Sequence, residues 1–453
     1  MILLVVFIVL LVIILRAILS ARALRKRAEL ALRESVVQHG LNHMPFLKGA
    51  ATSGFQSECS VSTAPPSLWR RFARLTNNEG VSPNHIHLPT LRRDMKLLKD
   101  MGGNAYRFSI EWARVSPRRG QLNAKALAYY QGVFNICYEL EMQPVVTLFH
   151  FVSPLWAHRV WTEGTDEFVQ FCCAMVDKFA GDSRVAPIFV TLNEPYLYAL
   201  HAYMVGARPP FIRDRKICVT VLSNMLADHV KVYRYIKMVA PQCTVTIAKN
   251  VMPVHPSAMG NVSDHLLAYE FNKFFNESYF DFINTGIIDL SLLGCSVKND
   301  TGQWPVLDIF GCNHYTEVCM KTQLSLISPV TLLLQDPFGS THDFMTAAGW
   351  VTSPFSWHNT LDMIKENVKL PILITECGVS QGQEGYKNTI TQGDAMRHIL
   401  KAISCHRQVI GVLVWTDCTS LEWEHTDVKF GIFDTDRNPT PIYEPIKDFF
   451  KKV

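Results

Sequence analysis

The sequence predicts a closed (β/α)8 barrel of the α/β class, on two observations. Eight short, apolar, β-rich runs recur along the chain, and amphipathic helical stretches such as 88–102 and 165–181 separate them. Near-continuous apolar strands that alternate with helices are typical of a parallel sheet covered by helices. Eight such units in one chain favour a closed barrel over two or three open sheets.

Each apolar run is interpreted as one buried parallel strand. The alternative, a doubly wound open sheet, requires a Gly-rich phosphate turn after an early strand, whereas the GGN at 102–104 precedes its strand. The eight predicted strands are FLKGAATS (46–53), NAYRFSI (104–110), PVVTLFH (144–150), PIFVTLNE (187–194), TVTIAKN (244–250), LDIFGCNHY (307–315), PILITEC (371–377) and VIGVLVWTD (409–417).

Composition excludes several classes of protein. The chain has 453 residues, of which 48% are hydrophobic, so it is not disordered and can bury a large core. The net charge of +4 comes without a long basic stripe after residue 30, so nucleic acid is not an expected partner. Twelve cysteines without a C-x-x-C pair are typical of small buried side chains in a reducing compartment.

The first residues form a separate unit in this interpretation. MILLVVFIVLLVIIL, Arg16 and AILSA together reach the ~20 residues that a spanning helix needs. A signal peptide is the alternative, but the basic stretch that should precede its apolar run is missing. We therefore expect a transmembrane anchor at 1–21, a basic connector at 22–45 and the barrel at 46–453.

Charges next to the predicted anchor indicate its orientation. Basic residues follow the apolar run, which by the positive-inside rule predicts that the barrel faces the cytoplasm. Three N-x-S/T sequons favour the opposite side, where glycosylation occurs. The basic residues are Arg16, Arg22, Arg25, Lys26 and Arg27, and the sequons begin at Asn261, Asn276 and Asn299.

Polar and aromatic residues follow the predicted strands at their carboxyl ends. In a (β/α)8 barrel these ends converge on one rim, where active sites lie. Strand four ends in Glu194 and strand seven in Glu376, so two carboxylates are expected across one barrel mouth. Arg107 lies within strand two, and the other residues at or just beyond strand ends are Gln56, Glu111, Trp112, His150, Asn193, Asn313, His314, Tyr315, Trp415, Glu422 and Trp423.

Two facing carboxylates beside aromatic and amide side chains indicate chemistry on glycosides. Hydrolysis of an acetal requires protonation of the leaving oxygen and stabilisation of an oxocarbenium-like centre. One carboxyl group supplies the proton, and the other supplies negative charge or acts as the nucleophile. Amide, imidazole and carboxylate groups bind hydroxyls, and indole rings pack on the apolar face of a sugar. This chemistry requires no metal and no organic cofactor.

The chain resembles the β-glucosidase family, family 1 of the glycoside hydrolases, from about residue 46 to about 445. VTLNEP (190–195) is similar to the family's T-x-NEP motif and ITECG (374–378) to its I-TENG motif. Five further segments follow in the family's order and spacing. They are YRFSIEWARVSP (106–117), QPVVTLFHFVSPLW (143–156), GCNHY (311–315), GWVTSP (349–354) and LEWEHTDVKFGIFDTD (421–436).

The resemblance implies a role for each matching residue. Glu194 would be the acid/base and Glu376 the nucleophile, with Trp350 flanking the leaving group. The residues implied to bind the sugar are Gln56, His150, Asn193, Glu422 and Trp423, with Trp415 as the floor. Those implied to surround the nucleophile are Arg107, Asn313 and Tyr315.

Departures from the family pattern leave the sugar preference open. Cys377 stands where asparagine usually follows the nucleophile, Ser420–Leu421 replaces Asn-Phe, and His314 breaks the commoner aromatic pair. The pair His85-x-His87 lacks a third metal ligand in register and is interpreted as loop.

Three functions follow from these residues. The first is a retaining β-glycosidase, with a β-linked glycoside or glycolipid as substrate. The second is a transglycosylase acting on glycolipids, because the anchored chain resembles the membrane-bound plant galactolipid galactosyltransferase of the same family. The third is a non-catalytic sugar-binding relative, which the altered residues around 377 and 418–421 suggest.

Overall fold

The structure is a computed structural model, and it describes most of the chain. The described residues are 45–76, 78, 82–181, 185–322, 330–333, 344–423, 425 and 427–453. The predicted anchor at 1–21, and the predicted connector except for its last residue, lie outside them. Within the described ranges, no helix combines the length and the hydrophobicity that a bilayer crossing requires.

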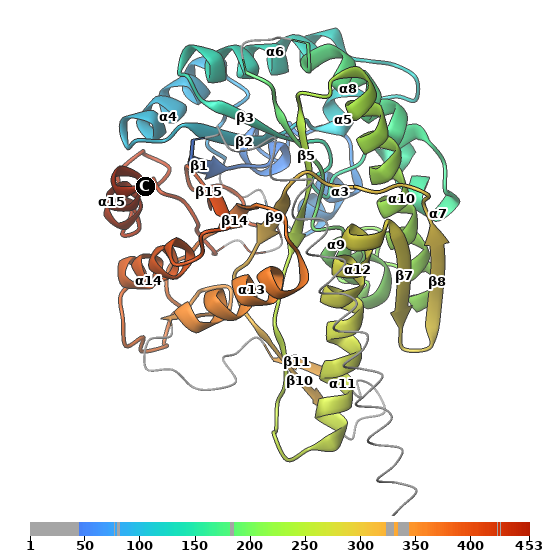
Figure 1. The fold of residues 1–453 in the computed structure, drawn as a ribbon. Coiled ribbons are helices and arrows are strands. Elements are labelled where there is room, and N and C mark those ends of the chain that lie inside the picture. Colours follow the sequence, from blue (N-terminus) through green and yellow to red (C-terminus); the bar gives the residue numbers. More distant parts are fainter. Residues whose placement is uncertain are drawn as a thin grey trace, which may run out of the picture.

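A closed barrel of eight parallel strands forms the centre of the molecule, which confirms the predicted fold (Figure 1). Its strands run in the order β1-β15-β14-β9-β5-β4-β3-β2, and each falls within or overlaps one predicted run. The strands are β1 Leu47–Ala51, β2 Ala105–Ser109, β3 Gln143–Thr147, β4 Ile188–Asn193, β5 Thr244–Asn250, β9 Phe310–Asn313, β14 Ile372–Cys377 and β15 Val409–Trp415.

Packing on both faces of the strands explains why the runs are almost wholly apolar. β2, β4, β9 and β14 are buried along their whole length. Inside the barrel lies a compact cluster that includes Val145, Ile188 and Leu413, and helices cover the outside. Close strand approach selects glycine at position 49, where a Cβ would lie 2.0 Å from the carbonyl oxygen of Ala105.

Helices surround the barrel, and the two stretches predicted at 88–102 and 165–181 form α4 and α8. Side chains cap several of them; Asn123, for example, accepts from two backbone N–H groups at the start of α6. The longer helices are α3 Leu68–Leu75, α4 Leu88–Asp100, α6 Ala124–Glu139, α8 Glu167–Phe179, α10 Arg215–Val239, α12 Ser278–Thr285, α13 Pro354–Asn367, α14 Gln392–Ser404 and α15 Tyr443–Lys452. The short ones are α2 Gly54–Ser57, α5 Trp112–Val115, η1 Leu155–Ala157, α7 Val160–Glu163, α9 Pro195–Ala199, η2 Leu200–Val205 and η3 Lys273–Glu277.

Segments that the sequence pattern did not predict extend the barrel between β5 and β14. Helix α11 (Val262–Asn272) packs beside a small sheet of β6, β10 and β11, and both project away from the barrel (Figure 1). The added strands are β6 Val254–Pro256, β7 Ile287–Leu292, β8 Cys295–Asp300, β10 Val318–Thr322, β11 Val330–Leu333, β12 Phe344–Met345 and β13 Val351–Thr352.

Candidate active site

A cavity of about 260 Å³ opens at the carboxyl ends of the barrel strands. Nine of the residues that the sequence analysis proposed line it, which brings together strand ends more than 250 positions apart in the chain. These nine are His150, Asn193, Glu194, Tyr315, Trp350, Glu376, Trp415, Glu422 and Trp423. Gln56, Arg107 and Asn313, also proposed, lie directly behind them and are 1% exposed or less.

Glu376 is held at the end of β14 by a cation and a phenol. The Arg107 guanidinium donates to its Oε1 at 2.7 Å, and the Tyr315 hydroxyl donates to its Oε2 at 2.9 Å. Burial raises the pKa of Glu376 to about 7; Arg107 opposes this effect and the charge of Glu194 adds to it. The effect of the Glu194 charge on the pKa of Glu376 shows that the two carboxyl groups lie close enough to interact electrostatically.

Glu194 follows β4 and is oriented by amide groups. The side chains of Asn313 and Asn250 donate to its Oε1 at 2.9 and 3.1 Å. Its backbone is in the left-handed region, with φ +46°, and Pro195 begins α9 directly after it. Such a conformation costs about 1–3 kcal/mol in a non-glycine residue and is characteristic of functional sites. The turn aims a carboxyl group into the cavity instead of continuing the strand.

Arg107 connects the two sides of the site. It is fully buried in β2, and besides Glu376 it donates to Asn193 at 2.7 Å and to the Thr147 hydroxyl at 3.0 Å. Every one of these contacts is to a group at a strand end. A buried guanidinium without such partners is very costly, and its acceptors come from three strands, β3, β4 and β14, of which only β3 pairs with β2.

His150 is a neutral imidazole in this environment. Burial, together with the charge of Arg107, lowers its pKa well below the usual value. Its Nε2 lies 3.2 Å from the Asn193 amide nitrogen, which makes Nε2 the acceptor and places the proton on Nδ1. His150 Nδ1 has no hydrogen-bond partner among the described residues, so it is a donor available to a ligand hydroxyl.

Aromatic rings and one further carboxylate form the inner end of the cavity. The ring of His150 stacks against Trp415 and Trp423, with centroids 5.8 and 6.0 Å apart. Glu422 accepts from the Trp415 indole at 3.2 Å and from Gln56 at 3.4 Å. Gln56 therefore lies beneath Glu422 and positions it, with its own amide also bound to the Leu421 carbonyl.

The outer part of the cavity has a different character. It is lined by apolar side chains from segments beyond the strand ends. The inner end of the cavity is therefore polar and aromatic, and the outer end is apolar. These side chains are Leu197 of α9, Leu200 of η2, Met252, Phe271 of α11 and Val318 of β10. Two basic residues, His201 and Arg208, also line it.

Among the side chains that hydrogen-bond to Glu194 or Glu376, Asn250 escaped the sequence analysis although its signal was present. Asn250 ends β5 and contacts Glu194, in the same way that polar residues end the other strands. The two departures from the family pattern at Cys377 and His314 lie outside the cavity wall, because neither residue lines the cavity. His314 Nε2 instead lies 2.6 Å from the hydroxyl of Ser356 in α13. These two substitutions therefore do not alter the wall of the cavity.

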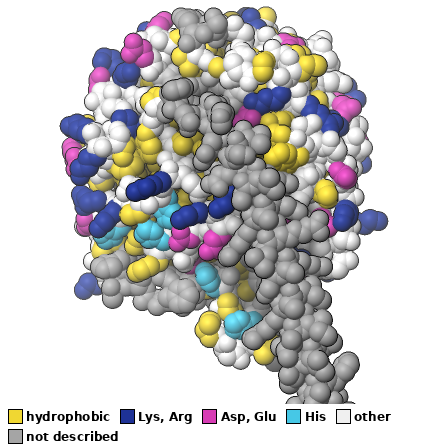
Figure 2. All heavy atoms as spheres, viewed as in Figure 1, with side chains coloured by type: hydrophobic (Ala, Val, Ile, Leu, Met, Phe, Trp, Pro, Cys, Tyr) yellow, Lys and Arg dark blue, Asp and Glu magenta, His cyan; other side chains and the backbone are white. Residues whose placement is uncertain are grey.

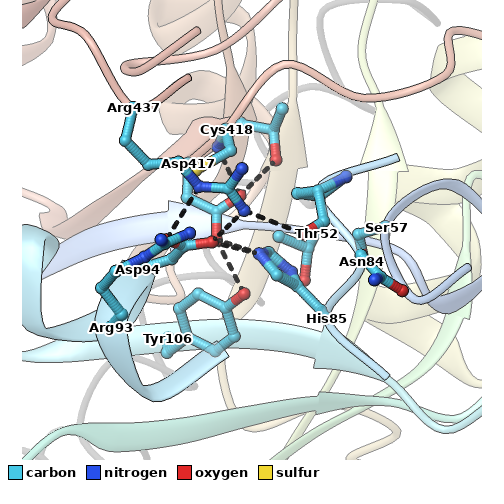
Figure 3. Close-up of polar contacts among 12 residues, drawn as sticks. Thr52, Ser57, Asn84, His85, Arg93, Asp94, Tyr106, Asp417, Cys418 and Arg437 are labelled. Carbon is cyan, nitrogen blue, oxygen red and sulfur yellow. Dashed lines mark hydrogen bonds and ion pairs between the residues drawn. The ribbon is translucent and has the colours of Figure 1, made fainter. Parts of the chain in front are cut away.

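A second charged network lies behind the end of β15 (Figure 3). His85 Nε2 lies 3.1 Å from Asp94 and 3.8 Å from Asp417, while Arg437 donates to Asp94 at 2.8 Å. The Tyr106 hydroxyl donates to Asp417 at 2.8 Å. Burial raises the pKa of Asp94, but hydrogen bonds from His85 and Arg437 outweigh it and hold the pKa well below its usual range.

Within the described residues, one group brings three possible metal-ligand atoms within 4.8 Å of one another: His85, Asp417 and Cys418. The sequence analysis interpreted His85-x-His87 as loop; His87 is exposed, whereas His85 acquires partners from residues more than 300 positions away. The guanidinium of Arg437 already supplies a positive charge at this place. The network is therefore compensated by the protein's own cation.

These observations define a class: barrel proteins with two buried carboxyl groups sharing one cavity at the carboxyl ends of the strands. The chain belongs to glycosyl hydrolase family 1, whose family model matches residues 41–450.

Relatives of the chain carry different substrates in their names. β-Glucosidase A of Thermotoga maritima is 26% identical over 424 residues, covering 86% of this chain and 92% of the relative. A 6-phospho-β-galactosidase of Clostridium acetobutylicum is 25% identical, covering 86% and 92%. A β-glycosidase structure from Pyrococcus horikoshii superimposes with a TM-score of 0.73 at 25% identity, covering 90% of this chain and 93% of the other. The family is thus established, and the sugar is not.

Proposed function

We propose that the protein is a retaining β-glycosidase that hydrolyses β-O-glycosidic bonds by double displacement. The observation that carries the proposal is the pairing of unlike carboxyl groups in one cavity. Glu376 receives a guanidinium and a phenol, whereas Glu194 receives neutral amides. Since two adjacent carboxyl groups do not both ionise readily, the negative charge is best placed on Glu376 and the proton on Glu194.

The reaction then proceeds in two balanced steps. Protonated Glu194 donates its proton to the glycosidic oxygen while a Glu376 carboxylate oxygen attacks the anomeric carbon, so the alcohol leaves and a glycosyl ester forms. Glu194, now ionised, removes a proton from water, and the water oxygen attacks the same carbon. The ester bond breaks, the sugar leaves and both carboxyl groups return to their starting states. Two inversions retain the configuration, for which the two carboxyl groups need a separation of ~5–5.5 Å.

The inner end of the cavity supplies partners for a sugar. His150 Nδ1, Asn193 and Glu422 offer a donor, an amide and an acceptor, and Trp415 and Trp423 offer aromatic faces. Gln56 supports Glu422 from behind. Because the hydroxyl-binding groups are a mixture of donors and acceptors, they suit a neutral hexose without naming its epimer.

A panel of chromogenic aryl β-glycosides tests the proposal on the purified full chain in detergent. We expect turnover of at least one β-hexoside. NMR should show the β-anomer of the free sugar first, before mutarotation. Appearance of the α-anomer first would reject the double displacement, and lack of turnover across the panel would favour the non-catalytic sugar-binding alternative.

The apolar outer end of the cavity supports a second candidate, transglycosylation between glycolipids. Apolar side chains there restrict water and favour a lipid-linked acceptor, and a sugar hydroxyl resolves a glycosyl ester as readily as water does. Incubating the detergent-solubilised protein with a glycolipid separates the two outcomes. Oligoglycosyl lipid would indicate transfer, and free sugar would indicate hydrolysis.

A further inference from the structure

Helix α11 carries an exposed apolar stripe. Val262, Leu266 and Tyr269 are 72%, 62% and 55% exposed, and Met259, just before the helix, is 74% exposed. Spacings of four and three residues place the three helical side chains on one face. A contiguous exposed apolar face on a soluble domain marks an interaction surface, unlike single scattered residues. We call Met259, Val262, Leu266 and Tyr269 the α11 stripe.

The opposite face of the same helix reaches the candidate active site. Asp264, Ala268 and Phe271 are buried there, and Phe271 lines the apolar outer part of the cavity. One helix of 11 residues therefore has an apolar face toward solvent and an apolar contact with the cavity. A ligand that touches the α11 stripe is about one helix diameter, roughly 10 Å, from the cavity wall.

Polar residues border the α11 stripe as they do on helices that lie at a lipid interface. His265 and Glu270 are exposed on its two flanks. Lys273, four residues after Tyr269, and Lys321 on the neighbouring β10 are exposed as well. Lysine side chains can keep their ammonium groups in water while their methylene stems cover apolar surface. Figure 2 shows hydrophobic side chains beside histidines on this projecting part.

Other exposed apolar residues gather at the same end of the barrel. Each lies in a segment that leads from the carboxyl end of a barrel strand to the next barrel helix, or in the first turn of that helix. They are Leu75, Leu122, Val205, Phe211, Phe355 and Tyr386. The mouth of the barrel thus carries exposed apolar side chains besides the α11 stripe, while Met238, Val239 and Val453 are exposed at the ends of α10 and α15.

We propose that the α11 stripe rests on a lipid bilayer, and that the cavity takes glycosides whose aglycone is a lipid chain from that bilayer. This inference rests on the proposed function, and it names the substrate class of that site. Two apolar features support the proposal. The α11 stripe would lie among the lipid headgroups, and the outer wall of the cavity is apolar. The lipid chain would pass Phe271 with its sugar at Glu194 and Glu376.

The predicted anchor before the barrel supports the bilayer as the occupant. Residues 1–21 are the predicted anchor, and the 24 residues of the predicted connector, 22–45, precede β1. β1 begins at the end of the barrel opposite the mouth. A connector of this length reaches at most about 80 Å when extended, so an anchored barrel can lay its mouth on the same membrane.

Quenching by lipid tests the contact on the full chain, reconstituted in phosphatidylcholine vesicles. A dye is placed at Leu266→Cys in a Cys405→Ser background, because Cys405 is the one exposed cysteine of the twelve. The matched control is Met238→Cys, at the end of α10 on the far side, where Met238 is 71% exposed. We expect brominated lipid to quench the fluorescence of the dye at position 266 and to leave the fluorescence of the dye at position 238 unchanged.

Equal quenching at the two positions would overturn the proposal. So would a change at 266 that persists in detergent and grows with protein concentration, because that behaviour indicates a second copy of the chain on the stripe.

Turnover tests the consequence for the substrate. We expect Leu266→Glu to lower kcat/KM for a β-glycosyl diacylglycerol in vesicles by about tenfold, because the added carboxylate resists burial at the lipid interface. Activity toward a soluble aryl β-glycoside should stay within about twofold, and Met238→Glu should leave both activities unchanged. Equal losses on the two substrates, or no loss on the glycolipid, would overturn the inference. Lack of aryl glycoside turnover in the unaltered chain would instead reject the proposed function, and the quenching result would stand apart from it.

Discussion

Two buried charge clusters of similar composition lie at the barrel's carboxyl end, and they differ in access. The mouth cluster consists of Arg107, Glu194, Glu376 and Tyr315, with neutral His150 beside it. It borders a cavity of about 260 Å³, and Glu194, Glu376 and Tyr315 line that cavity.

The sealed cluster consists of His85, Asp94, Asp417, Arg437 and Tyr106. It has the same ingredients: an arginine, two carboxyl groups and a tyrosine. His85 and Tyr106 border a cavity of about 10 Å³, about the space that one water molecule needs. Its carboxylates are bound by His85, Arg437 and Tyr106. The difference teaches that access to a ligand, and not the kind of residue, separates a reactive pair from a structural one.

The largest expected effect concerns the carboxyl groups of the mouth cluster. Glu376→Gln and Glu194→Gln should each lower kcat for an aryl β-glycoside by about 10³-fold or more, because each removes a group that acts in the covalent mechanism. Steady-state kinetics measure the loss, and circular dichroism checks the fold. Asp94→Asn, in the sealed cluster, serves as the matched control and should keep the kcat of the folded molecules. Unchanged activity in either glutamate variant would contradict the assignment.

The next effect concerns stability rather than activity. Arg437→Met should lower the free energy of unfolding by about 2–3 kcal/mol, because it removes the guanidinium that donates to both oxygens of the fully buried Asp94 carboxylate and leaves that carboxylate with His85 and the exposed Arg93 as partners. Urea denaturation measures the change. The double variant Asp94→Asn with Arg437→Met should lose less than the sum of the single variants. A purely additive result would show that the ion pair does not couple the two residues.

A smaller effect is expected at Tyr315. Tyr315→Phe removes the phenol that donates to Glu376 at 2.9 Å, a hydrogen bond to a charged group worth about 1.5–2 kcal/mol. The variant should lose roughly 10–30-fold in kcat/KM. The hydrogen bond from Tyr315 lowers the pKa of Glu376, so its removal should raise that pKa and move the acid limb of the pH profile to higher pH. The same loss without a shift of the limb would indicate a role in substrate binding alone.

The smallest effect is the pH dependence of the unaltered protein. Glu376 must be ionised to attack, and burial raises its pKa to about 7, above the ordinary value for a glutamate. Activity should therefore be low in acid and rise through pH 7, with kcat/KM at pH ~6 about tenfold below its maximum. Asp94, whose pKa is held low, stays ionised over the same range. An acid limb near pH 4.5 would show that burial does not perturb the nucleophile.

Much of this molecule could be predicted from local patterns. The eight strands could be predicted from apolar runs, because a strand that is buried on both faces is apolar at nearly every position. The rim location of Glu194, Glu376 and Asn193 follows from one rule of barrel geometry. The projection that carries α11 was not predicted, because its strands are short and the helix has apolar residues on both its buried and its exposed face, which leaves no clear amphipathic pattern. Asn250 was also missed, although it ends a barrel strand like the other site residues.

The sequence by itself determined the fold class, the family and the two carboxyl groups, since these depend on residue types at positions along a regular element. Only the tertiary structure decided which charged groups share a cavity and which are sealed. His85 meets Asp417 across a separation of 332 positions that no local pattern records. The contact of Arg107 with Glu376, 269 positions apart, was implied by the family resemblance and not by a local pattern. Contact, burial and therefore pKa are properties of the neighbours that folding supplies.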